Sequence, residues 1–282
     1  MREISDVREM RLYSQKAKSH DKIVGFVPTM GALHEGHLSL VAEAEKRADV
    51  AVVSIFVNPI QFGPGEDFVR YPRDLGKDRK LLKNFDIDVL FLPKTAEMFP
   101  EGFKTYVEVE GLSKKMCGRS RPTHFRGVTT VVSKLFNIVC PELAFFGEKD
   151  YQQQLIIKQM VRDLNLPVEI ISLPTVREFD GLAMSSRNAY LSPKERKSAT
   201  ILYKALLLAK EEIERGEKDI RRIIFRIRSL IATEPPVRLD YVMMVDPETL
   251  GEVKKLKGKV LVALAAYIGK TRLIDNLTVI AG

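Results

Sequence analysis

Two histidines three positions apart, His34 and His37, stand in the segment PTMGALHEGHLSLV and make up half of the histidines in this chain. Imidazoles bind metals, transfer protons or donate hydrogen bonds to anions. A structural zinc site takes four ligands, and HEGH differs from the HExxH pair of metalloprotease helices. The remaining histidines, His20 and His124, show no ligand pattern. Zinc is therefore disfavoured, while core packing and contact with a ligand both stay open.

The two histidines lie between a predicted strand, Ile23–Pro28, and a predicted helix, Gly36–Arg47. Open α/β sheets bind ligands beyond the carboxyl ends of their strands, and helix N-termini favour phosphate. Gly31 and Gly36 would let the backbone approach a ligand closely. Two common nucleotide-binding motifs are absent, GxGxxG after the first long strand and GxxxxGK[ST]. A nucleotide would therefore have to bind through a different motif.

The segment FGEKDYQQ, residues 146–153, joins a predicted strand to a predicted helix. Gly147 permits a tight turn, and Lys149 can meet a phosphate as a mobile charge. Asp150 suits a helix N-cap or a ribose hydroxyl. An ordinary charged loop is the alternative.

The segment GLAMSSRNAYLS, residues 181–192, holds two hydroxyl groups and a guanidinium in succession, Ser185–Arg187. Such a group is a compact anion clamp. Ser192 and Pro193 have the types of an N-cap and a first helical residue. Ser185–Arg187 lie too far upstream to serve that helix, which favours anion binding over a solvated, capped loop.

Polar residues also follow the second long predicted strand, Val50–Val57. Asn58 and Gln61 suit the orientation of a small polar substrate, although either residue could equally satisfy its own loop. Arginines gather later in GRSRPTHFRGV, residues 118–128, where a basic surface loop is the alternative. They are Arg119, Arg121 and Arg126.

Strands and helices alternate through the first part of the chain, which predicts a doubly wound parallel sheet of Rossmann-like α/β class. The expected helices there are Glu3–Ser19, Gly36–Arg47, Asp74–Asn84, Val128–Val139 and Tyr151–Leu164. Two helices, Pro193–Arg215 and Lys218–Ala232, then precede three strands, Arg238–Val245, Lys259–Ile268 and Arg272–Ile280. Residues 1–175 are expected to form this Rossmann-like, ligand-binding domain, and residues 176–282 a smaller α+β domain.

The composition belongs to a globular protein with a hydrophobic fraction of 45% and a net charge of +8, most of it in residues 176–282. The longest apolar run is far too short for a membrane span. Neither a signal peptide nor a disulfide framework is evident, so a cytoplasmic location is expected. A basic nucleic-acid-binding protein is the alternative of a different class, but RRIIFRIR is explained more simply as an amphipathic helix.

HEGH resembles the HxGH signature of the nucleotidyltransferase superfamily. PTMGALHEGH, FVNPIQF, YPR, RPTHFRGV, FGEKDYQQ and DGLAMSSRN together resemble the pantoate–β-alanine ligase family, in its order and spacing. The resemblance implies condensation of (R)-pantoate with β-alanine at the expense of ATP, through pantoyl adenylate, with release of pyrophosphate and AMP. Another HxGH nucleotidyltransferase acting on a different small acid is the alternative.

By the same resemblance, His34 and His37 would contact the phosphates, His37 as proton donor, and Lys149 would bridge the α-phosphate and pantoate. Val176 would meet adenine through its backbone. Gln61 and Gln153 would bind pantoate, with Asn58 and Arg121 in or beside that pocket. The whole ATP site would comprise Met30, Gly31, Ala32, Leu33, His34, Glu35, Gly36, His37, Gly147, Glu148, Lys149, Asp150, Val176, Met184, Ser185, Ser186 and Arg187.

Mg²⁺ is expected with the triphosphate, since it usually needs only one or two carboxylates, and Asp78 is the candidate protein ligand. The basic second domain would act as a lid that excludes water from the adenylate. A homodimer is a further implication of the resemblance. The expected partners are ATP, pantoate and β-alanine, with neither nucleic acid nor membrane.

Overall fold

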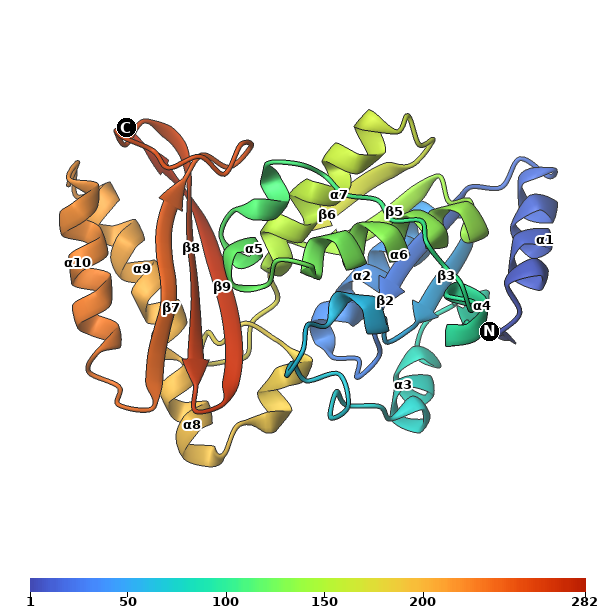
Figure 1. The fold of residues 1–282 in the computed structure, drawn as a ribbon, viewed down its shortest axis with the longest axis horizontal. Helices are drawn as coiled ribbons and strands as arrows, with labels where there is room; N and C mark the ends of the chain where they lie inside the picture. The colour runs from blue at the N-terminus through green and yellow to red at the C-terminus, as the bar shows by residue number, and fades with distance from the viewer. The chain divides into compact units, whose positions relative to one another are not determined.

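The computed structural model describes all residues, 1–282, which form two compact units (Figure 1). The N-terminal unit comprises residues 1–114, 118–148 and 153–174. The C-terminal unit comprises residues 175–282 together with two short segments from earlier in the chain, residues 115–117 and 149–152.

The N-terminal unit is built on a parallel sheet of six strands in the order β1-β4-β3-β2-β5-β6. This confirms the doubly wound α/β prediction. Continuous apolar runs suit such strands because helices cover the sheet. The strands are β1 (Arg2–Ile4), β2 (Val24–Thr29), β3 (Val50–Ile55), β4 (Val89–Phe91), β5 (Leu143–Gly147) and β6 (Glu169–Leu173).

Helices lie against both faces of this sheet. Successive residues of a strand point to opposite faces, and in β2 the side chain of Val27 packs with Val41 of α2 (Glu35–Arg47). Its neighbour Phe26 meets Phe136 of α6 (His124–Val139) with ring centroids 6.4 Å apart. The other helices in this stretch are α1 (Val7–Lys18), α3 (Leu75–Leu82), α4 (Thr95–Met98), α5 (Cys117–Ser120) and α7 (Tyr151–Asp163).

Two element boundaries in the N-terminal unit differ from expectation. The chain begins with strand β1, which pairs with β4, before α1 starts behind the N-cap Asp6. The periodicity of the first helix masked this three-residue strand, whose pairing partner lies far along the chain. The helix expected from Val128 begins at His124, so part of the motif RPTHFRGV is helical rather than loop.

The C-terminal unit has the antiparallel sheet and paired helices expected of an α+β domain. Its strands, in sheet order, are β7 (Val237–Val245), β8 (Gly258–Ile268) and β9 (Thr271–Ala281). The helices are α8 (Pro193–Ala199), α9 (Ile201–Glu214) and α10 (Ile220–Ile231). The single helix expected over residues 193–215 is therefore two helices that meet at Thr200.

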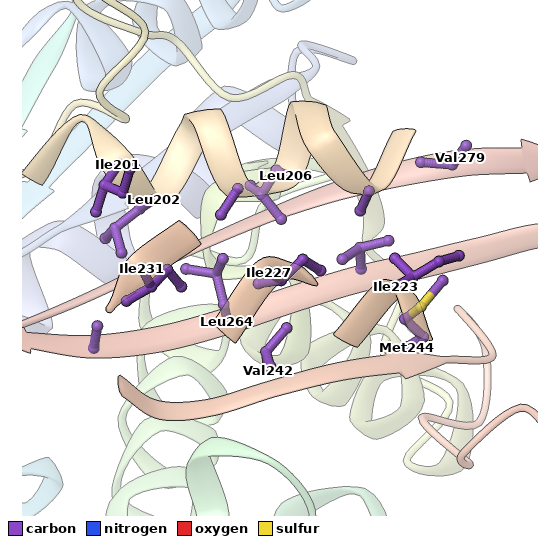
Figure 2. Close-up of a cluster of buried hydrophobic side chains, with 14 of the residues drawn as sticks. Ile201, Leu202, Leu206, Ile223, Ile227, Ile231, Val242, Met244, Leu264 and Val279 are labelled. Carbon is purple, nitrogen blue, oxygen red and sulfur yellow. The ribbon is translucent and has the colours of Figure 1, made fainter. Parts of the chain in front are cut away.

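Helix α10 packs its isoleucines into the core of this unit (Figure 2). Ile223 and Ile227 are fully buried, whereas Arg222 and Arg226 form ion pairs with the nearby acids Glu217 and Glu212. The helix is thus an amphipathic cover for the sheet, as its spacing predicts.

None of the helices combines the length and the apolar character that a membrane span requires.

Gly127 makes a close approach between α6 and the short helix at Pro59–Gln61 possible. A Cβ atom at Gly127 would lie 2.4 Å from the carbonyl oxygen of Ile60 and 2.6 Å from the Cα atom of Gln61. These are backbone atoms, so relief requires the helix or the loop to move.

We expect Gly127→Ala to lower the free energy of unfolding by about 2 kcal/mol, the usual effect of overpacking, as measured by urea denaturation. Gly76→Ala is the matched control, because Gly76 is also helical and its added Cβ would meet only Asp74 at 3.5 Å. That variant should be neutral or stabilising by up to about 1 kcal/mol. Equal stability of the two variants would contradict the close approach.

Candidate active site

The strand order places a topological switch point beside β2. The chain runs from β2 outward to β3 and β4, then returns to lay β5 against the other side of β2. Loops leaving the carboxyl ends of β2 and β5 therefore diverge, which opens the position where doubly wound sheets bind ligands. The first loop carries Met30–His34, and the second begins at Gly147.

The loop after β2 has an unusual backbone. Gly31 and Ala32 are consecutive left-handed residues, with φ of 78° and 50°. Glycine adopts this conformation readily, but a residue with a side chain does so at a cost. A Cβ atom on Gly31 would also lie 2.9 Å from Ile55 and 3.0 Å from Asp78. The turn therefore requires glycine at this position.

Asp78 of α3 holds this turn. Its Oδ2 accepts a hydrogen bond from the backbone N–H of Ala32 at 3.0 Å, and its Oδ1 accepts one from Leu33 at 2.8 Å. The side chain is almost fully buried. Burial raises the pKa of Asp78 above its usual value, while the hydrogen bonds from Leu33 and Ala32 act in the opposite direction. The structure thus gives this carboxylate a role in ordering the loop that the sequence did not predict.

His34 is the N-cap of α2, and its ring has a defined protonation. The Nδ1 atom accepts a hydrogen bond from the backbone N–H of Gly36 at 3.1 Å. An accepting nitrogen carries no proton, so His34 is neutral and its ring proton is on Nε2. The ring of His37 lies 4.1 Å away between centroids, tilted by 36°. The two imidazoles thus form one adjacent pair, and His34 presents an N–H donor.

Asn58 and Gln61 lie together beside the loop after β2. The Asn58 amide donates from Nδ2 to Oε1 of Gln61 at 2.9 Å and to the carbonyl oxygen of Gly127 at 3.1 Å. Nε2 of Gln61 contacts the sulfur of Met30 at 3.0 Å. Oδ1 of Asn58 is buried and accepts no hydrogen bond from the protein. A buried acceptor of this kind is suited to a donor on a ligand.

Arg121 lies beside Gln61 and forms an ion pair with Glu66. Its guanidinium donates to both carboxylate oxygens of Glu66, from Nε at 2.7 Å, and also reaches the main-chain oxygen of Gln61 at 3.5 Å. Burial raises the pKa of Glu66, but the hydrogen bonds and charge of Arg121 outweigh it, and the net pKa is below the usual value. Nδ1 of His124 lies 3.0 Å from the same oxygen of Gln61. Direct contact between Arg121 and a substrate stays a prediction.

Lys149 and Asp150 belong to the C-terminal unit, although they follow β5 along the chain. The ammonium of Lys149 lies 3.9 Å from the carboxylate of Asp150. Asn276 of β9 donates from Nδ2 to the carbonyl oxygen of Lys149 at 2.9 Å. The C-terminal sheet thus fixes the main chain at the lysine.

The serine and arginine motif follows a short hairpin in the same unit. Met184 donates its N–H to the carbonyl oxygen of Val176 at 3.0 Å, and the side chain of Ser185 accepts from the N–H of Arg187. Arg196 holds this hairpin by ion pairs with Glu178 and Asp180.

Of the remaining predicted residues, Glu35 and Gly36 open α2, Gly147 ends β5, and Glu148 begins the turn after it. Gln153 lies in α7 and belongs to the N-terminal unit.

No cluster of three or more histidine, cysteine or acidic side chains is arranged to hold a metal. The structure therefore offers no preformed metal centre.

Known proteins resemble this chain over almost its whole length. The model of the pantoate-beta-alanine ligase family matches residues 2–278. The chain belongs to this family. It is 56% identical to the pantothenate synthetase of Carboxydothermus hydrogenoformans over 98% of both chains, and 56% identical to that of Acetivibrio thermocellus over 99% of both.

Solved structures of the family have the same fold. The pantothenate synthetase of Thermus thermophilus is similar with a TM-score of 0.93 and 48% identity, over 98% of this chain and 99% of the other. A ligase from Francisella tularensis, in complex with beta-gamma ATP and β-alanine, gives a TM-score of 0.80 and 36% identity, over 98% and 97%. The ligase activity, which joins pantoate to β-alanine, is thus established for this chain.

Several supporting residues of the ligase were not singled out from the sequence. His124 and Gly127 lie inside the motif RPTHFRGV, in which only the arginines were predicted to be functional. Glu66 is one of several charged residues in the loop after β3, and its bond to Arg121 joins residues 55 positions apart. The motif itself could have indicated His124 and Gly127. Nothing in the local sequence indicates the pairing of Glu66 with Arg121.

We expect Asp78→Ala to lower the free energy of unfolding by about 2–4 kcal/mol, because it removes the acceptor of two N–H groups in the turn. Amide hydrogen exchange at Ala32 and Leu33 should speed up accordingly. Asp74→Ala is the control: it removes the N-cap of the same helix, which accepts from Lys77 at 2.9 Å, and should cost about 1 kcal/mol. Unchanged exchange at Leu33 in Asp78→Ala would contradict the assigned role.

Proposed function

We propose that this ligase works in two steps, with ATP as the activating substrate. The pantoate carboxylate attacks the α-phosphorus of ATP, which forms pantoyl adenylate and releases pyrophosphate. The amine of β-alanine then attacks the acyl carbon and releases AMP, with loss of a proton. A carboxylate is a poor acyl donor, and adenylation gives it a leaving group. The bound ligands in the Francisella structure, beta-gamma ATP and β-alanine, support this proposal.

The observation that carries the proposal is the histidine pair at the N-terminus of α2. His34 is held neutral with its proton on Nε2, as its bond to Gly36 requires. We assign it to hydrogen-bond donation toward a phosphate oxygen. His37, 4.1 Å away between ring centroids, then serves as the proton donor as charge grows on the pentacoordinate phosphorus. Both histidines act chiefly by stabilising that charge.

The other phosphate-binding groups in this proposal lie mainly in the C-terminal unit. Lys149 bridges the α-phosphate and pantoate, within a segment, Gly147–Asp150, that holds ribose and phosphate. Val176 meets adenine through its backbone, and Met184–Arg187 bind the β- and γ-phosphates. The turn at Ser185 and the anchored main chain of Lys149 support these assignments, since fixed donors bind anions with little reorganisation.

Pantoate and β-alanine are assigned to the pocket around Gln61. Asn58 fits this assignment because its buried Oδ1 accepts nothing from the protein and can accept from a substrate hydroxyl or ammonium group. Gln153 is assigned to pantoate by the resemblance. Arg121 supports the pocket through Gln61 and Glu66.

Mg²⁺ is proposed to enter as part of the ATP complex, held mainly by phosphate oxygens and water. Asp78 as a metal ligand stays a prediction, because its two oxygens already accept N–H groups of the turn. A ligand role predicts that Asp78→Ala needs more Mg²⁺ for half-maximal rate at fixed ATP. A role in the turn alone predicts an unchanged Mg²⁺ requirement.

We further propose that the enzyme works in the cytoplasm as a homodimer. Its two cysteines, Cys117 and Cys140, are both free thiols, which suits a reducing compartment. The dimer rests on the family resemblance, and light scattering coupled to size-exclusion chromatography measures it directly.

We expect the enzyme to exchange pyrophosphate into ATP when pantoate is present and β-alanine is absent. His37→Ala should lower the rate constant of exchange by about a hundredfold or more, the effect of losing a group that stabilises the transition state. His20→Ala is the control, because that histidine is exposed at the end of α1. Exchange without pantoate would refute the two-step route, and exchange with a different acid in its place would favour another nucleotidyltransferase activity. Full exchange in His37→Ala would refute the role of that histidine.

We also expect Arg187→Ala to slow exchange by about tenfold or more and to impair folding far less, because we propose that Arg187 binds phosphate. Arg221→Ala, at an exposed position of α10, is the matched loss of one arginine and should leave exchange and folding unchanged. If the two variants exchange pyrophosphate equally fast, Arg187 has no part in adenylate formation.

A further inference from the structure

A buried ion pair in the C-terminal unit joins two segments that lie far apart in the sequence, residues 177–181 and 275–276. Arg177 donates to both carboxylate oxygens of Asp275, at 2.6 and 2.9 Å. It also donates to the carbonyl oxygens of Gly181, at 3.1 Å, and Asn276, at 3.3 Å. A bidentate pair fixes both the distance and the orientation of its partners.

The surroundings leave this pair little freedom. Asp275 is 2% exposed, and the guanidinium of Arg177 lies 4.0 Å from the ring centroid of Tyr203. The same ring packs so closely on Gly181 that an added Cβ would lie 2.2 Å from it. Breaking such a buried pair is strongly unfavourable, so its partners remain in one geometry.

Asn276 extends this arrangement to the lysine segment. Oδ1 of Asp275 accepts the backbone N–H of Asn276 at 2.8 Å, while the Asn276 side chain donates from Nδ2 to the carbonyl oxygen of Lys149 at 2.9 Å. Burial raises the pKa of Asp275, whereas Arg177 and the charge of Lys149 lower it. The charge of Lys149 therefore acts on Asp275 of the ion pair as well as on the neighbouring Asp150.

We propose that Asn276 is a positioning residue for Lys149. It holds the main chain at the lysine and is itself held by the Arg177–Asp275 pair. The side chain of Lys149 is flexible, so a fixed main chain limits where its ammonium can reach. Arg177 also anchors the hairpin that leads into Ser185–Arg187. Both proposed phosphate-binding segments are thus attached to one point on β9. This inference rests on the proposed role of Lys149 in adenylate formation.

A double-mutant cycle tests the inference. Asn276→Leu keeps the approximate volume of the side chain and removes the donor, and Asn276→Ala is the second variant should leucine disturb folding. We expect either to lower the rate constant of pantoate-dependent pyrophosphate exchange by about tenfold to a hundredfold. The KM for ATP should change by less than about threefold, because the loss concerns orientation in the reaction rather than substrate affinity. In a Lys149→Ala background the same substitution should have almost no further effect.

Thr278→Ala is the matched control, since Thr278 lies on the same strand two positions on, and therefore on the same face. It should leave exchange unchanged in both backgrounds. An equal loss from Asn276→Leu with and without Lys149 would overturn the inference and leave Asn276 a structural residue. Full activity of Lys149→Ala would instead refute the proposed role of the lysine, and absent exchange in the unmodified enzyme would refute the two-step function.

Discussion

The turn between β2 and α2 is the constraint on which the proposed site in the N-terminal unit depends. Two consecutive left-handed residues, Gly31 and Ala32, bring the chain from the carboxyl end of β2 to the start of α2. Such a backbone persists only where its surroundings determine it, and Asp78 does so by accepting two N–H groups of the turn. This backbone leads directly into the N-cap His34, whose ring accepts the N–H of Gly36.

Much of this architecture follows from the sequence because the signals are local. The apolar run Val50–Val57 identifies a buried strand, and alternation of strands and helices identifies the parallel sheet that the structure confirms. The histidines could be placed at the mouth of that sheet because they directly follow a strand. For the same reason Lys149 could be placed after β5. Spacing and residue type were sufficient wherever a strand end determined position.

The features that escaped prediction depend on distant partners. The residue type of Asp78 made it a candidate. Its hydrogen bonds to a turn 45 and 46 residues away could not be predicted. Strand β1 forms only because β4 pairs with it, while its residues also suit the helix expected there. The Arg177–Asp275 pair spans 98 residues, and neither residue belongs to a motif that would mark it. Physical contact across the chain, rather than local preference, decides these features.

The grouping of the two segments that we propose to bind phosphate bears on the mechanism. Lys149 and Ser185–Arg187 are separated in sequence, yet both are attached to β9 of the C-terminal unit, through Asn276 and Arg177. Positive groups that stabilise a triphosphate repel one another. If the bound substrate has to bring them together, part of its binding free energy is lost. In the proposed site, the bonds of Asn276 and Arg177 attach both segments to β9 before any ligand binds. Preorganisation of this kind favours the reaction, because the groups need not rearrange as charge shifts toward the departing pyrophosphate.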